Sequence, residues 1–327
     1  MTSPGVPSTG AGRFAPSPSG DLHLGNLRTA LLAWLFARST GRMFLVRMED
    51  LDRVQVGADA RQLADLAAIG LDWDGPVVYQ SHRTGRYDDA ISRLSGAGLT
   101  YECFCTRREI RESASAPHPE PLGSAHRGAA GAYPGTCRNL TSAEIADRRR
   151  TRRPSALRLQ ADVPEFTIQD ELRGLFTGAV DDLVLRRNDG VAAYNLAVVV
   201  DDAAQGIDQV VRGDDLLSSA PRQAYLGSLL GLPPVRYAHV PLALNPAGQR
   251  LAKRDGAVTL AELAAIGLVA EQVLTVIAQS LALTGPGERV TPTVLLDRFD
   301  ATLLPAKPWI VDPAVLVSPP GSGHSRA

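Results

Sequence analysis

Residues 12–39 read GRFAPSPSGDLHLGNLRTALLAWLFARS, and this stretch decides the fold of the chain. It predicts a strand at Arg13–Ala15, a small-residue turn at Pro16–Gly20 and a helix that begins near Gly25. Where a strand enters a helix through such a turn, the first helical N–H groups lack partners and the helix dipole favours an anion. His23 adds a side chain that can donate to a phosphate oxygen. The stretch therefore predicts a nucleotide-phosphate site whose backbone a ligand can approach at its glycines.

Length and charge limit the class of protein. The chain has 327 residues, enough for two or three domains, and a formal net charge of −1. That balance excludes a global basic field, so a nucleic-acid site would have to be a local patch. No run of about 18 apolar residues occurs, and Met1–Gly10 lacks the features of a secretory signal. Three cysteines do not indicate a disulfide framework. We expect a cytoplasmic protein with no membrane partner.

Outward from this stretch, short strands and helices alternate. Met43–Met48 is an apolar run of the buried-strand type, and Glu49 and Asp50 follow it. Carboxylates at the carboxyl end of a central strand lie where open α/β sheets bind ligands, although a solvated loop is the alternative. Helical patterns follow at residues 57–69 and 86–96. The first hundred residues therefore predict a doubly wound parallel sheet.

The pattern changes at a cysteine-containing segment. Cys103 and Cys105 are separated by one residue, residues 113–132 are rich in small residues, and Cys137 follows. Zinc takes four tetrahedral ligands, so three cysteines leave one ligand to find. On general chemistry a histidine is preferred over a tyrosine; the candidates are Tyr133, His118 and His126. The alternative is three unrelated buried cysteines.

The second half of the chain predicts more strands and a helical end. The three valines within Tyr194–Asp202 favour a strand that ends in an acidic pair. Ile207–Arg212 is another strand, and Gly213–Asp215 caps a helix at residues 216–230. Further strands are expected at residues 156–159, 167–176, 182–187 and 237–244, and helices at residues 260–268, 270–281 and 292–299.

Two basic features have ordinary alternatives. Arg148–Arg153 is a run of five arginines and one threonine, which is either a solvated face or a contact for a polyanion. Lys253 lies in a polar segment that ends in glycine, where a mobile lysine can neutralise charge in phosphoryl chemistry. Taken singly, Lys253 is an ordinary surface lysine.

Taken in order, these motifs resemble the class I glutamyl-tRNA synthetases over residues 12–256. His23–Asn26 is similar to the "HIGH" signature of that family, and Arg250–Arg254 is similar to its "KMSKS" loop. Asn26 stands where the signature has a second histidine. Arg250 and Ala252 replace the usual lysine and serine, and the lost hydroxyl is expected to weaken loop closure.

The resemblance implies an α/β fold with a doubly wound parallel, Rossmann-type sheet, a zinc-containing insertion and a small C-terminal helical region. A disordered lead-in (1–11) is expected before the first half of the catalytic domain (12–100). The zinc insertion with an acceptor-binding-like region (101–180) and the second half of the catalytic domain (181–244) follow. The lysine loop with C-terminal helices (245–317) and a disordered tail (318–327) end the chain.

The sequence is also similar to a shorter paralogue within the family, because only about seventy residues follow the lysine loop. That resemblance implies activation of L-glutamate with ATP and Mg²⁺. The glutamyl group would then pass to the queuosine base in the anticodon loop of tRNA(Asp), and a monomer is expected. Alternatives are 3′-end aminoacylation, an inactive RNA-binding paralogue, or a nucleotidyl-transferase similar to pantothenate synthetase that activates another carboxylate.

The same resemblance assigns residues to glutamate. Arg13 and Arg212 would be carboxylate partners, while Ser17, Glu49 and Tyr194 would hold the α-amino group and the remaining polar atoms. An amide in place of the substrate carboxylate would leave a buried charge unpaired, which costs about 2–5 kcal/mol.

The resemblance also assigns residues to ATP and zinc. His23 and Lys253 would be catalytic and would contact the phosphates. The full ATP site would comprise Pro16, His23, Gly25, Asn26 and Lys253. The zinc ligands would be Cys103, Cys105, Tyr133 and Cys137, which places a tyrosine where general chemistry prefers histidine.

Overall fold

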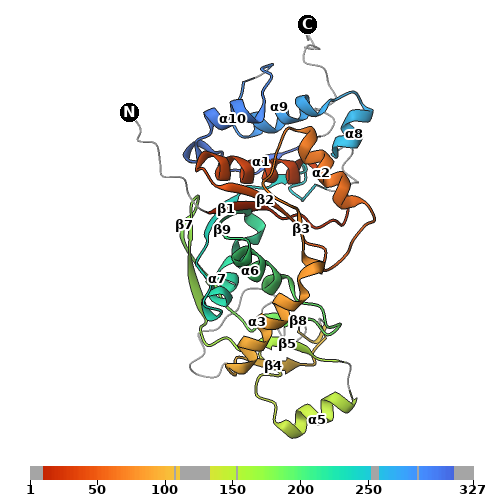
Figure 1. The fold of residues 1–327 in the computed structure, drawn as a ribbon, viewed down its shortest axis with the longest axis vertical. Coiled ribbons are helices and arrows are strands. Elements are labelled where there is room, and N and C mark those ends of the chain that lie inside the picture. Colours follow the sequence, from red (N-terminus) through yellow and green to blue (C-terminus); the bar gives the residue numbers. More distant parts are fainter. Residues whose placement is uncertain are drawn as a thin grey trace. The chain divides into compact units, whose positions relative to one another are not determined.

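The computed structural model describes residues 10–106, 108–110, 133–151, 154–251, 258–285 and 287–312. It divides into two compact units (Figure 1). Unit 1 takes the described residues of 1–79, 209–215 and 238–327, and unit 2 takes those of 80–208 and 216–237. The expected tail and nearly all of the expected lead-in lie outside the described residues, and Ala11 already belongs to the first strand.

Unit 1 is built on a mostly parallel sheet. Its strands are β1 (Ala11–Phe14), β2 (Met43–Met48), β3 (Val78–Tyr79), β9 (Ile207–Gly213) and β10 (Arg236–Val240), in the order β3-β2-β1-β9-β10. β1 pairs in parallel with β2, and β2 with β3. The chain passes between the two units after Tyr79, within β9, after Asp215 and within β10. The prediction of an α/β fold with a mainly parallel sheet is confirmed.

Helix α1 (Leu24–Ser39) is the central helix of unit 1. It contacts β1 and β2, and it also contacts α9 (Ala270–Ser280) and α10 (Pro292–Arg298), as Figure 1 shows. Covered by both layers, α1 buries side chains around most of its circumference and not only along one stripe. Helices α2 (Ala58–Ala68) and α8 (Leu260–Ala265) complete the predicted helical segments.

A small feature near the end of unit 1 was not predicted. β11 (Ala243–Leu244) pairs in parallel with β12 (Trp309–Ile310), which follows the short 3₁₀ turn η4 (Ala301–Leu303). Among the helices of the described residues, none is both long and apolar enough to cross a membrane.

Unit 2 contains a small antiparallel sheet in the order β4-β5-β8. Its strands are β4 (Thr100–Cys103), β5 (Ala156–Leu159) and β8 (Val184–Arg186). The 3₁₀ turn η1 (Gln80–Arg83) and helix α3 (Thr84–Gly96) precede the sheet, and helix α5 (Ser142–Thr151) lies between β4 and β5 in the chain.

The single strand expected at residues 167–176 is a hairpin. β6 (Glu165–Asp170) pairs in antiparallel fashion with β7 (Gly174–Ala179). The Asp170 carboxylate accepts hydrogen bonds from the N–H groups of Leu172 and Arg173, at 2.9 and 3.0 Å, and so closes the turn.

The strand predicted at Tyr194–Asp202 is wrong, because helix α6 spans Tyr194–Ala204. The buried residues recur at helical spacing, with Ala197 and Val198 one turn before Asp201. The Asp201 carboxylate accepts from Gln80 Nε2 at 3.0 Å and from the Tyr87 hydroxyl at 2.7 Å. These contacts require the helix and outweigh the strand preference of the valines.

The helix expected at residues 216–230 begins later. A 3₁₀ segment, η2, occupies Asp214–Ser219, and helix α7 spans Ala220–Leu229. Pro221 lies in the first turn of α7. Proline has no N–H and fits that turn best, so it marks where the new helix starts.

Candidate active site and cysteine cluster

His23 caps the N-terminus of α1. Its Nδ1 accepts a hydrogen bond from the Asn26 N–H at 3.2 Å, and the Asn26 Oδ1 accepts from the His23 N–H at 3.1 Å. Burial lowers the pKa of His23, and the charge of Arg250 lowers that pKa further. A neutral ring with Nδ1 as acceptor carries its proton on Nε2. His23 is therefore arranged to be an uncharged Nε2–H donor.

The expectation of unpaired N–H groups at this helix start is wrong at two positions. Leu24 N–H donates to the Val258 carbonyl at 2.9 Å, and Asn26 N–H is bonded to His23. Gly25 is required here for another reason: a Cβ at this position would lie 3.0 Å from His23 Cε1 and 3.2 Å from the Ala243 side chain. The imidazole of His23 therefore lies close against this glycine.

The turn at Pro16 and Ser17 is tied to the neighbouring strand and helix. The Pro16 carbonyl accepts from the Glu49 N–H at 2.9 Å. The buried Gln62 Nε2 donates to the carbonyls of Ser17 and Gly20, at 3.0 and 2.7 Å. The role of Gln62 was missed, although a glutamine between apolar positions of a helix was a usable signal.

Three charged side chains lie at or near the carboxyl ends of adjacent strands of unit 1. Arg13 is on β1, Glu49 directly follows β2 and Arg212 is on β9, and all three are buried. Arg13 Nη1 donates to the Val211 carbonyl at 3.5 Å. Open parallel sheets bind ligands at this edge. The structure thus places these three predicted residues on neighbouring strands of the sheet.

Two further residues contact this group, and sequence reasoning missed both. Arg47 is fully buried, and its Nη2 lies 3.3 Å from Glu49 Oε1. His239 on β10 is fully buried, and its Nε2 accepts from Arg212 Nε at 3.0 Å. Arg47 had a signal, since an arginine inside an apolar strand must find a partner. His239 had none, because its partner is 27 residues away.

The remaining predicted ligand-binding residues are less closely connected. Tyr194 belongs to unit 2, where it begins α6 with an exposed side chain. Lys253 lies outside the described residues. Arg250, next to that segment, forms an ion pair with Asp215.

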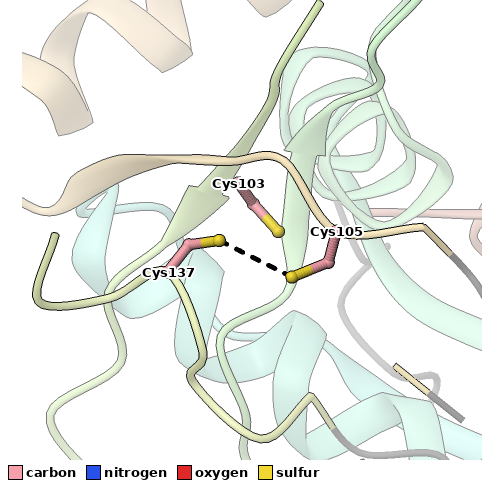
Figure 2. A group of neighbouring side chains, drawn as sticks. All are labelled: Cys103, Cys105 and Cys137. Carbon is pink, nitrogen blue, oxygen red and sulfur yellow. Dashed lines mark hydrogen bonds between the residues drawn. The ribbon is translucent and has the colours of Figure 1, made fainter. Parts of the chain in front are cut away.

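The three cysteines gather in unit 2, as Figure 2 shows. Their Sγ atoms all lie within 4.8 Å of one another, and those of Cys105 and Cys137 are 3.5 Å apart. Four ligands at about 2.3 Å from a zinc ion would place two sulfurs about 3.8 Å apart. The geometry therefore fits a tetrahedral metal. The predicted histidine alternatives lie outside the described residues: His118 and His126.

Tyr133 is the fourth member of this cluster. Its hydroxyl oxygen lies 3.4 Å from Cys103 Sγ and accepts from the Cys137 N–H at 2.8 Å. The guanidinium of Arg158 stacks 3.6 Å from the centre of the Tyr133 ring. Hydrogen bonding to Cys137 lowers the pKa of the Cys103 thiol to about 4 despite burial. Burial raises the pKa of the Tyr133 hydroxyl.

The basic run lies at the end of α5. Arg148, Arg149 and Arg150 are in its last turn, and Arg152 and Arg153 lie outside the described residues. Helix α5 buries none of its own residues. Arg149 pairs with Glu102 at 2.7 Å and Arg150 with Asp147 at 3.2 Å, both in exposed positions.

The mostly parallel sheet, the capped helix start and the buried charges at the strand ends define an α/β domain of the class that binds ligands at the carboxyl ends of its strands. Residues 11–316 match the family described as tRNA synthetases class I (E and Q), catalytic domain. The chain belongs to this family, and the resemblance seen in the sequence is confirmed.

Individual relatives narrow the comparison. The chain is 64% identical over 310 residues to the glutamyl-Q tRNA(Asp) synthetase of Nocardia farcinica (strain IFM 10152), covering 95% of this chain and 96% of the relative. It is 54% identical over 277 residues to the protein of that name from Cutibacterium acnes (strain DSM 16379 / KPA171202), covering 84% of this chain and 76% of that relative. A crystal structure of a glutamate tRNA ligase from Elizabethkingia meningosepticum, in complex with its amino acid, matches with a TM-score of 0.77 and 28% identity. The match covers 93% of this chain and 67% of that chain.

Proposed function

We propose that this chain activates L-glutamate with ATP as glutamyl-adenylate and transfers the glutamyl group to the queuosine base in the anticodon loop of tRNA(Asp). The observation that carries the proposal is the 64% identity, over nearly the whole of both chains, to a glutamyl-Q tRNA(Asp) synthetase. The pattern of buried charges at the sheet edge supports it, because glutamate carries two carboxylates and one ammonium group.

Glutamate binding follows from those charges. Arg13 and Arg212 are suited to carboxylates, since buried guanidinium groups present several donors in a fixed plane. Glu49 is suited to the α-ammonium, and Arg47 holds one of its oxygens. Ser17 lies on the turn between the strand and the helix, and Tyr194 stays a prediction as a further glutamate ligand.

Adenylate formation requires positioning more than covalent chemistry by the protein. The α-carboxylate of glutamate attacks the α-phosphorus of ATP in line, a P–O bond forms, and pyrophosphate leaves with the electron pair of the broken bond. The neutral Nε2–H of His23 would donate to a phosphate oxygen, and Lys253 would neutralise charge from the adjoining loop. Pro16, Gly25 and Asn26 shape the backbone beside ATP, which Mg²⁺ accompanies as a counterion.

A structural zinc ion is proposed for the cysteine cluster. Cys103, Cys105, Cys137 and Tyr133 would hold it, in agreement with the spacing of the three sulfur atoms. Zinc bound there would join β4 to the segment around Cys137.

A second candidate activity is transfer of glutamate to the 3′ end of a tRNA, because the similar crystal structure is a glutamate tRNA ligase. An inactive RNA-binding paralogue is a third reading, and the presence of His23, Glu49 and Arg212 in the chain argues against it. A monomer in the cytoplasm stays a prediction.

One experiment separates these activities. Purified protein is given ATP, glutamate and labelled pyrophosphate without tRNA, and we expect exchange of label into ATP. Labelled glutamate is then supplied with tRNA(Asp) that contains queuosine, and the product is digested to locate the label. Label on the base supports the proposal. Label on the 3′ terminal adenosine supports the second activity. Failure to exchange pyrophosphate both without and with tRNA supports the inactive reading.

A further inference from the structure

We infer that His239 is a positioning residue that fixes the guanidinium of Arg212 and so sets the selectivity of the site for glutamate. The inference rests on the proposed function at one point, the role of Arg212 as a carboxylate partner. Neither the sequence pattern nor the family resemblance assigned a role to His239.

The contact lies between two adjacent strands of unit 1. Arg212 is near the end of β9, and His239 is on β10, which neighbours β9 in the sheet. Arg212 Nε donates to His239 Nε2 at 3.0 Å. The histidine side chain is fully buried, and only 5% of Arg212 is exposed. Both partners are thus held in the core of the sheet.

This bond restricts how Arg212 can meet a carboxylate. A guanidinium presents two forks to a carboxylate, one from Nε and one Nη atom and one from both Nη atoms. With Nε directed at His239, a carboxylate meets the end formed by the two Nη atoms. His239 therefore selects the end-on geometry and sets the direction from which the substrate carboxylate approaches.

The bond also fixes the state of the imidazole. An imidazolium has donors at both nitrogens and no acceptor, so accepting at Nε2 requires a neutral ring protonated on Nδ1. A neutral histidine adds no second charge beside Arg212. The positive charge of this pair then belongs to Arg212 and not to the histidine.

An apolar residue at position 239 would fill similar volume but would leave a buried guanidinium N–H facing carbon. A lost hydrogen bond to a charged group corresponds to a change of about tenfold to a hundredfold in an equilibrium constant. Because glutamine also satisfies an arginine less well than glutamate does, loosening Arg212 should reduce discrimination between the two amino acids.

The test compares His239→Leu with His239→Gln. Both variants are assayed by pyrophosphate exchange without tRNA. We expect His239→Leu to raise the KM for glutamate by about tenfold to a hundredfold. The KM for ATP should stay near that of the unaltered protein. Its preference for glutamate over glutamine should fall. His239→Gln retains an acceptor for Arg212 Nε and should restore the KM and the preference.

Val240→Ala is the matched control, because Val240 is equally buried on the same strand and its apolar side chain has no group that could hydrogen-bond Arg212. It should lower the thermal stability without changing the KM for glutamate. The inference would be overturned if His239→Leu and the unaltered protein had equal KM values for glutamate. It would also be overturned if His239→Gln did not restore the KM for glutamate.

Calorimetric binding of glutamate separates this inference from the proposed function. If the unaltered protein binds glutamate but does not exchange pyrophosphate, the proposed function fails, and weaker binding by His239→Leu still upholds the inference. If the unaltered protein does not bind glutamate, both fail.

Discussion

At the scale of single residues, the close approach of Gly25 to the His23 ring allows the proposed role of His23 as a phosphate donor to be tested. A Cβ at position 25 would lie 3.0 Å from the His23 ring, so Gly25→Ala must displace the imidazole. We expect the rate of pyrophosphate exchange to fall about tenfold or more, as is typical when one transition-state donor is moved. Gly85→Ala is the control, because a Cβ there meets nothing within 4 Å. Equal rates for both variants would contradict this assignment of the donor.

Asp65 on α2 gives a prediction of pH dependence. Burial, and then the charge of Asp21, raises its pKa to about 6. In the unfolded chain the Asp65 carboxyl loses its proton at about pH 4. Ionising it is therefore less favourable in the folded protein than in the unfolded chain, and the free energy of unfolding falls as pH rises from about 4 to 6. Asp65→Asn should therefore increase the free energy of unfolding at pH 7 and have little effect below pH 4. Urea unfolding at both pH values measures this, and an equal effect at both would refute it.

At the scale of elements, helix α6 shows where local reasoning fails. β1, β2, α1 and α2 follow directly from apolar period and turn residues, and the structure places them within about two residues of expectation. The three valines at residues 198–200 favour a strand by local propensity, but they form part of a helix. What decides α6 is the buried carboxylate of Asp201 and its partners Gln80 and Tyr87, more than a hundred residues earlier. Such a contact leaves no periodic trace in a single sequence.

Helix α5 carries a prediction about RNA. It buries none of its residues and ends in three arginines, of which Arg149 and Arg150 are exposed while Arg148 lies 3.7 Å from Cys137 Sγ. Exposed ion pairs such as Arg149 with Glu102 are weak and can be exchanged for phosphates. We expect the double variant R149E/R150E to reduce transfer of glutamate to tRNA about tenfold or more, with a reduced salt dependence.

The same variant should leave pyrophosphate exchange without tRNA unchanged, since that step involves no RNA. R289E/R298E, with equal charge change at exposed positions of unit 1, is the control and should preserve both steps. Loss of transfer in both double variants would indicate a general effect of charge, and would refute a specific role of α5.

At the scale of the whole molecule, the sequence predicts elements better than the contacts between them. Arg13, Glu49 and Arg212 were proposed as ligand-binding residues by resemblance, and the strand order places them on adjacent strands. The residues that hold them, Arg47 and His239, were missed because burial depends on neighbours that are distant in sequence. The division into units was equally hidden, because two of the four points at which the chain changes unit lie in the middle of β9 and β10.

That division gives a prediction about metal removal. All four proposed zinc ligands belong to unit 2, where they connect β4 with the segment around Cys137. Metal analysis should give one zinc ion per chain, and Cys103→Ala should lose it. Because metal binding stabilises only the structure that supplies the ligands, chelation should speed amide hydrogen exchange in β4, β5 and residues 133–140. Exchange in β1 and β2 of unit 1 should not change.

Tyr133→Phe sharpens this prediction, because it removes the hydroxyl but keeps the ring against Arg158. If the hydroxyl is a ligand, this variant should release zinc at a lower chelator concentration while the ring still packs in the cluster. If zinc affinity is unchanged, a residue other than Tyr133 completes the site. If chelation speeds exchange in β1 and β2 as much as in β4, zinc stabilises the whole chain, and the two units do not respond separately to the metal.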